Sequence, residues 1–117
     1  MKTTIKQFQE FKNEVLRLQP ILGLQDWQIY FKHGKTEDTF ATTHYDREGA
    51  VANMNFGIEL KDDHKESLDI KRTAKHELLH LLLADLYCIA ESRVFDRFLL
   101  NQAEEKAIRK LEKFINL

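Results

Sequence analysis

Apolar side chains recur at spacings of three and four along the first part of the chain. Positions with this spacing share one face of a helix, so the pattern predicts an amphipathic helix over residues 3–18. Its apolar positions are Ile5, Phe8, Phe11, Val15 and Leu18. Pro20 and Gly23, two helix breakers, follow directly and are expected to end the helix.

Three segments after this helix have the composition and alternation of strands. Residues 27–31 (WQIYF) are aromatic and β-branched, and residues 39–45 (TFATTHY) give a weaker signal of the same kind. Apolar and polar residues mostly alternate over 50–60, which predicts a third strand. Gly57 within it indicates a bulge or the close approach of another backbone.

The second half of the chain predicts two helices. Ser67 or Asp69 is able to cap a helix that runs to about Cys88, and a further helix covers roughly residues 91–116. The resulting order is helix, three strands, helix, helix, without repeats or linkers. We therefore predict one α+β domain over residues 1–117, with a small three-stranded antiparallel or mixed sheet.

The first of these two helices carries a pair of histidines. His76 and His80 are four residues apart, so they lie on one helix face and are able to offer two imidazole nitrogens to one metal ion. Glu77 borders that face, in a position suited to a general base. The opposite side is apolar and would anchor the helix in the core; it consists of Leu78, Leu79, Leu82 and Leu86. In the competing interpretation both histidines are solvated or hydrogen-bonded residues beside a leucine core.

Composition narrows the possible functions. The chain has 18 Lys and Arg against 19 Asp and Glu, so no basic excess indicates nucleic acid as a partner. Cys88 is the single cysteine, which excludes an intramolecular disulfide and a cysteine-based zinc site. The first residues lack the apolar segment of a signal peptide, and no run approaches the roughly 18 apolar residues of a membrane span. We expect a cytoplasmic protein that does not associate with membranes.

The residues HELLH at 76–80 match the H-E-x-x-H motif, and in this motif the sequence resembles the zincin metallopeptidases. The resemblance implies a zincin-like fold and one zinc ion bound by His76, His80 and a third protein residue, with water in the fourth position. Glu77 then takes a proton from that water while the water attacks a peptide carbonyl. Metzincins are excluded, because Leu83 and Leu86 stand where that subgroup has Gly and His.

Periodicity separates two candidates for the third ligand on the last helix. Most helical neighbours of Glu104 are apolar, whereas most neighbours of Glu105 are polar. A carboxylate in an apolar stripe costs free energy unless it is coordinated or paired, and Ala107 leaves room for the histidine helix to pack nearby. The pattern favours Glu104 as the ligand and keeps Glu105 as the alternative; in a purely structural role, Glu104 would pair with Arg97 or Lys110.

In gluzincins, a glutamate from a following helix completes the zinc site. The residues EEKA at 104–107 also resemble the E-x-x-A run of small phage and mobile-element metallopeptidases of the ImmA/IrrE type. This resemblance covers roughly residues 50–117 and implies a protein or peptide substrate. In zincins the strand before the active helix pairs with extended substrate, which assigns that role to 50–60. His44 and Tyr45 are candidate donors to an oxyanion. The predicted function is a zinc-dependent peptidase; the alternative is a non-catalytic metal-binding or protein-interaction module with the same fold.

Overall fold

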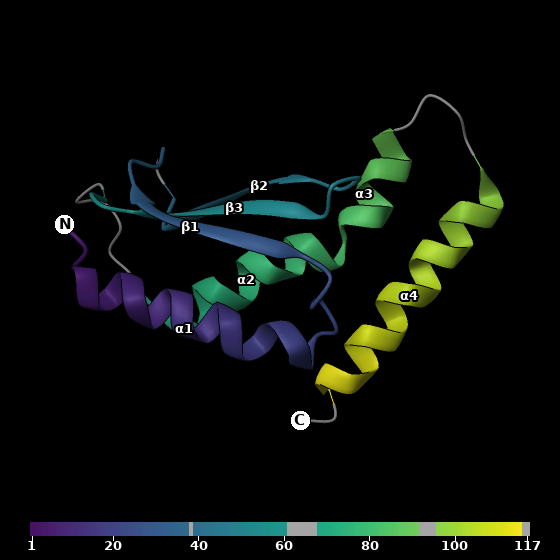
Figure 1. Ribbon diagram of the computed structural model, residues 1–117, viewed down its shortest axis with the longest axis horizontal. Helices are drawn as coiled ribbons and strands as arrows, with labels where there is room; N and C mark the ends of the chain where they lie inside the picture. The colour runs from purple at the N-terminus through teal and green to yellow at the C-terminus, as the bar shows by residue number, and fades with distance from the viewer. Residues whose placement is uncertain (38, 61–67, 92–95, 116–117) are drawn as a thin grey trace.

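The computed structural model describes residues 1–37, 39–60, 68–91 and 96–115, and these residues form four helices and three strands (Figure 1). The elements in chain order are α1 (Ile5–Ile21), β1 (Gln28–Gly34), β2 (Ala41–Asp46), β3 (Val51–Gly57), α2 (Ile70–Leu82), α3 (Ala84–Glu91) and α4 (Arg97–Ile115). The predicted α+β class and the three predicted strands are confirmed.

Helix α1 begins and ends with recognisable local signals. The Thr4 side chain accepts a hydrogen bond from the Gln7 backbone N–H, and the Gln7 side chain accepts one from the Thr4 N–H, so two end groups of the helix are satisfied reciprocally. Pro20 does not end the helix as predicted but lies inside its last turn. The chain leaves the helix at Gly23, whose φ of 68° is a conformation that side-chain-bearing residues rarely adopt.

The sheet is mixed, with strand order β1-β3-β2. The central strand β3 runs parallel to β1 and antiparallel to β2. Helices α1 and α2 pack side by side and cover one face of this sheet (Figure 1). The largest fully buried side chains come from both layers: Phe11, Val15, Leu22, Leu24, Met54, Phe56 and Leu78. The sheet is therefore buried on one face, which explains the alternation seen in the sequence.

Gly57 lies where two chain segments approach closely, as the sequence predicted. Its N–H donates to the Phe40 carbonyl over 2.9 Å. A Cβ at position 57 would come within 2.7 Å of the Thr36 hydroxyl and 3.3 Å of the Phe40 carbonyl oxygen. A larger residue would therefore force these segments apart.

The helix predicted to run to about Cys88 is two helices. Asp69 is the cap of α2, since its carboxylate accepts from the Arg72 N–H over 3.1 Å. The alternative cap, Ser67, lies outside the described residues. Helix α2 ends at Leu82 with Leu83 as its C-terminal cap, and α3 begins at Ala84. The continuous apolar run hides this break, because leucines on either side of it are equally compatible with a helix.

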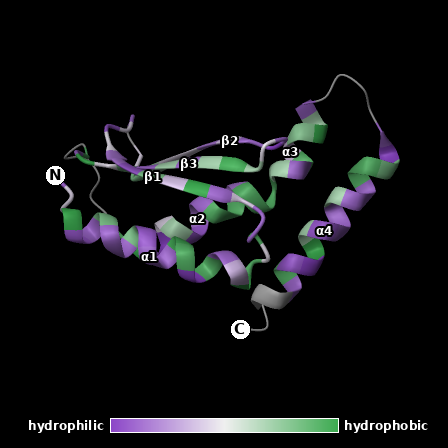
Figure 2. Ribbon diagram, in the orientation of Figure 1, coloured by the Kyte–Doolittle hydropathy of each residue, from purple (hydrophilic) through white to green (hydrophobic). Residues whose placement is uncertain are grey.

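Helix α4 packs against α3 and lies apart from the sheet (Figure 1). The Asp85 carboxylate of α3 accepts a hydrogen bond from Arg47 over 2.6 Å and another from Lys106 of α4 over 3.0 Å. This one carboxylate therefore connects α3, α4 and the turn after β2. Figure 2 shows hydrophilic and hydrophobic residues interleaved along α4, as expected of an amphipathic helix. None of the helices in the described part of the chain is both long and apolar enough to cross a membrane.

Candidate metal centre

Helix α2 turns its leucines inward and its histidines outward. Leu78 and Leu82 of α2 are buried, as predicted for the core side, and Leu79 of α2 is half-buried, as is Leu86 of the next helix, α3. His76 and His80 are both exposed on the other side. The predicted orientation of the helix about its own axis is confirmed at these positions.

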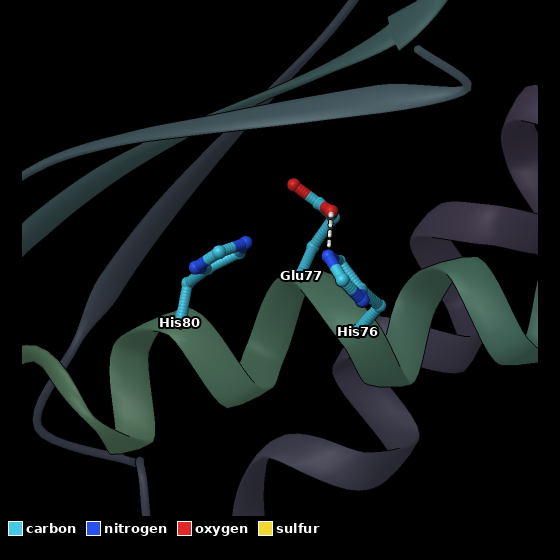
Figure 3. A group of neighbouring side chains, drawn as sticks. All are labelled: His76, Glu77 and His80. Carbon is cyan, nitrogen blue, oxygen red and sulfur yellow. Dashed lines mark ion pairs between the residues drawn. The ribbon is translucent and has the colours of Figure 1, made fainter.

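Three side chains gather on the histidine face. The ligand atoms of His76, Glu77 and His80 all lie within 4.8 Å of one another, and within the described residues no other group of His, Cys, Asp and Glu meets this criterion. The two imidazole rings are nearly perpendicular, with centroids 5.0 Å apart. In Figure 3 the three side chains rise from α2 toward the strands, with Glu77 between the imidazoles.

The donor set suits zinc. Tetrahedral ligands at 2.0–2.1 Å from an ion lie about 3.3 Å apart, so modest side-chain rotations would bring the two imidazoles to coordinating distance. His76 has a side-chain exposure of 69%, which leaves it free to rotate. Two neutral imidazoles beside a carboxylate are ligands that zinc commonly takes. The residues present therefore fit a zinc ion, for which His76 and His80 would be two ligands from this helix.

Glu77 differs from its neighbours in being buried, with a side-chain exposure of 5%. Its Oε1 accepts a hydrogen bond from the Thr43 hydroxyl over 2.8 Å, and its Oε2 lies 4.0 Å from His76 Nε2. Burial raises the pKa of Glu77 above its ordinary value, although the bond from Thr43 and the nearby His80 and His76 oppose this shift. The carboxyl group is held in place and takes up a proton more readily than an exposed glutamate.

A groove that includes His80 lies between β2 and α3. Its lining residues come from β2 on one side and from the end of α2 and α3 on the other: Thr43, His44, Tyr45, His80, Leu83, Tyr87, Cys88 and Glu91. The two predicted oxyanion donors, His44 and Tyr45, therefore lie in the same groove as His80. The Tyr45 ring also packs edge-on against Trp27, with centroids 5.8 Å apart, and burial raises its pKa.

The structure does not bring Glu104 to the histidines. Glu104 is exposed on α4, and among residues 97–112 of that helix the buried positions are Ala103 and Ala107. The expectation that Glu104 lies in a packed apolar stripe is therefore wrong, because the side of α4 that is buried carries the alanines and not Glu104. Glu105 is exposed as well and faces a different groove, lined also by Asp85 and Lys106. The assignment of either glutamate as a metal ligand stays a prediction.

Two other downstream carboxylates have definite positions. Asp85 pairs with Arg47 and Lys106 and is not part of the His76–Glu77–His80 group. Glu91, at the end of α3, lines the groove that contains His80. Thr43 was not identified from the sequence, since it lies 34 residues before its partner Glu77 and no local pattern connects them.

The prediction that segment 50–60 is the strand that pairs with substrate is wrong. Segment 50–60 forms β3, which lies between β1 and β2 and has both of its edges paired. The edge strand next to the histidine helix is β2, which contacts α2. Strand order depends on pairings between distant segments, so the alternation within 50–60 did not determine which strand lies at the edge.

Comparison of the chain with protein-family models, with curated proteins and with solved structures gave no match.

Proposed function

We propose that this protein is a zinc-dependent peptidase in which His76 and His80 bind one zinc ion and Glu77 acts as the general base. The observation that carries the proposal is the convergence of two exposed imidazoles and one buried carboxylate, whose ligand atoms lie within 4.8 Å of one another, beside a groove that His80 and an edge strand line. A leucine-rich core helix has no need for a buried carboxylate between two histidines.

A zinc ion in this place would supply a Lewis acid for the peptide carbonyl and lower the pKa of water at the site. The two exposed imidazoles of α2 would hold the ion. Glu77 accepts the proton released as water attacks and delivers it to the leaving amine. Its position between the two imidazoles, held by the Thr43 hydroxyl, suits this exchange.

The edge strand β2 is suited to bind an extended peptide. The Phe40 carbonyl accepts a hydrogen bond from the Gly57 N–H, so the backbone groups of Phe40 face β3. Because this direction alternates from residue to residue along an antiparallel strand, the backbone groups of Thr43 and Tyr45 face away from β3. These groups face an edge that no strand occupies in the described part of the chain. A substrate strand added there would be held through its main chain, next to His80. The proposed substrate is therefore an extended protein or peptide segment.

Metal content and peptide cleavage test the proposal together. The purified protein is loaded with zinc, its metal content is measured by mass spectrometry, and cleavage is followed with a fluorescence-quenched peptide library. We expect about one zinc per chain, loss of zinc in His76→Ala, and retained zinc with at least about 100-fold slower cleavage in Glu77→Gln. Glu10→Gln, an exposed glutamate on α1, is the matched control and is expected to behave as the wild type.

The outcomes separate the candidate functions. Unchanged cleavage in Glu77→Gln would show that the peptidase proposal is wrong. A wild type that binds zinc through His76 and His80 without cleaving any peptide supports the non-catalytic metal-binding module. A protein without zinc, whose stability is also unaffected by His76→Ala, contradicts the metal site itself.

The third protein ligand needs a separate comparison. Glu104 remains the candidate from the sequence, whereas Glu91 is the downstream carboxylate that shares a groove with His80. Zinc dissociation constants of Glu91→Ala, Glu104→Ala and Glu105→Ala distinguish them, since loss of one ligand weakens binding strongly and loss of a bystander does not. If Glu104 is the ligand, α4 has to change its position against α3 when zinc binds.

A further inference from the structure

The hydroxyl of Thr43 is the donor that fixes the buried Glu77. It donates to Glu77 Oε1 over 2.8 Å, from a strand that lies 34 residues earlier in the chain. A buried carboxylate without a donor is unfavourable, so this bond accounts for the position of the side chain. The remaining oxygen, Oε2, is the one that lies 4.0 Å from His76 Nε2.

The bond also restricts how the carboxylate rotates. The last torsion of a glutamate has a broad, roughly two-fold distribution, so a free carboxylate presents either oxygen in many orientations. With Oε1 held by Thr43, the lone pairs of Oε2 stay directed to the histidine side. A base with one fixed oxygen spends more of its time in the geometry that proton transfer requires.

The strand environment makes Thr43 a rigid donor. Thr43 pairs with Met54 across the β2–β3 ladder, and Met54 is fully buried, so both side chains point into the layer between sheet and helices. Threonine is branched at Cβ, which limits its side chain to few rotamers. The backbone N–H and C=O of the same residue point to the open edge of β2.

We infer that Thr43 is a positioning residue that aligns the base with the substrate backbone. The inference rests on the proposed peptidase function, in which an extended peptide pairs with β2. One residue then has two contacts: its hydroxyl orients Glu77, and its main chain faces the place of the peptide. The distance between base and peptide is thereby set within a single residue of the edge strand.

Two substitutions at Thr43 test the role of the hydroxyl. Thr43→Val keeps the branched shape and removes the donor, whereas Thr43→Ser keeps the donor. We expect kcat to fall about 10- to 100-fold in Thr43→Val, as when other supporting hydrogen bonds around a site are removed, with KM and zinc content unchanged. Thr43→Ser is expected to stay within about threefold of the wild type. Thr42→Val, whose side chain points to the other face of the sheet, is the matched control.

A metal-free readout checks the bond itself. In the presence of a chelator, Thr43→Val is expected to lower the melting temperature by about 5 °C or more, because it leaves a buried carboxylate without its donor. Thr43→Ser is expected to recover most of this loss. If Thr43→Val does not fold, Thr43→Ala replaces it in both measurements.

Several results would overturn the inference. They are a kcat within threefold of the wild type in Thr43→Val, a Thr43→Ser variant as slow as Thr43→Val, and a loss of zinc in parallel with activity. If Glu77→Gln is inactive while Thr43→Val is not, this inference alone is wrong. If Glu77→Gln cleaves like the wild type, the proposed function is wrong and the inference falls with it.

Discussion

Replacing Leu78 by alanine tests the orientation of α2 on which the metal centre depends. Leu78 is fully buried on the helix side opposite the histidines. The substitution removes three carbon groups, worth about 0.8 kcal/mol each, and leaves a cavity that adds to this loss. We expect the free energy of unfolding to fall by about 3–4 kcal/mol, a large part of the stability of a small domain.

Thermal and urea unfolding, followed by circular dichroism in a chelating buffer, measure this loss without a contribution from bound metal. With about 2.1 cal/mol/K of unfolding entropy per residue over 117 residues, a loss of 3 kcal/mol corresponds to roughly 12 °C in melting temperature. Leu83→Ala is the matched control, since Leu83 is 44% exposed and its loss is expected to cost less than about 1 kcal/mol. Equal losses in the two variants would refute the assigned orientation, and with it the outward position of His76 and His80.

Three further predictions concern charge and metal. Zinc at about 100 times its dissociation constant is expected to raise the free energy of unfolding by about 2.7 kcal/mol, and His80→Ala is expected to abolish this gain in a calorimetric melt. Burial raises the pKa of Glu77, so in the metal-free protein its ionisation weakens the fold progressively as the pH rises above 4.5. Glu77→Gln should therefore stabilise the metal-free protein at pH 7 and lose this advantage near pH 4. Urea unfolding measures this difference, and the reasoning would be contradicted if the substitution raised the urea midpoint more at pH 4 than at pH 7. Burial alone would raise the pKa of Asp85, but hydrogen bonds from Arg47 and Lys106 outweigh it and lower that pKa. Its stabilising effect is thus present above pH 3.8 and lost as the pH falls through its folded pKa. Asp85→Asn should therefore cost about 1 kcal/mol at pH 7 and progressively less as the pH falls below 3.8.

Local patterns determined the parts of the fold that the sequence predicted correctly. The cap at Asp69, the core position of Leu78 and the outward histidines all follow from spacing along one helix. The same holds for the strands, where alternation reflects a sheet with one buried face. Each of these features depends on residues within about two turns or a few strand positions of one another.

The errors about the candidate site and the strand order concern contacts between distant segments. The position of α4 depends on Asp85 meeting both Arg47 and Lys106, and periodicity within α4 carries no information about that meeting. The exposure of Glu104 is a consequence of this packing. The central place of β3 and the bond from Thr43 to Glu77 are likewise set by pairings over long stretches of chain.

The burial of Glu77 is also what distinguishes a functional carboxylate from an incidental one. A glutamate that only stabilised α2 would be exposed or paired with a cation, and its replacement by glutamine would be neutral or unfavourable. Glu77 is instead buried, and the groups close to its oxygens are a neutral hydroxyl and an imidazole that is charged only when protonated. A cation between the histidines would offset the cost of that buried charge. Glutamine at position 77 should therefore stabilise the metal-free fold and abolish cleavage at the same time, a combination that a purely structural glutamate does not produce.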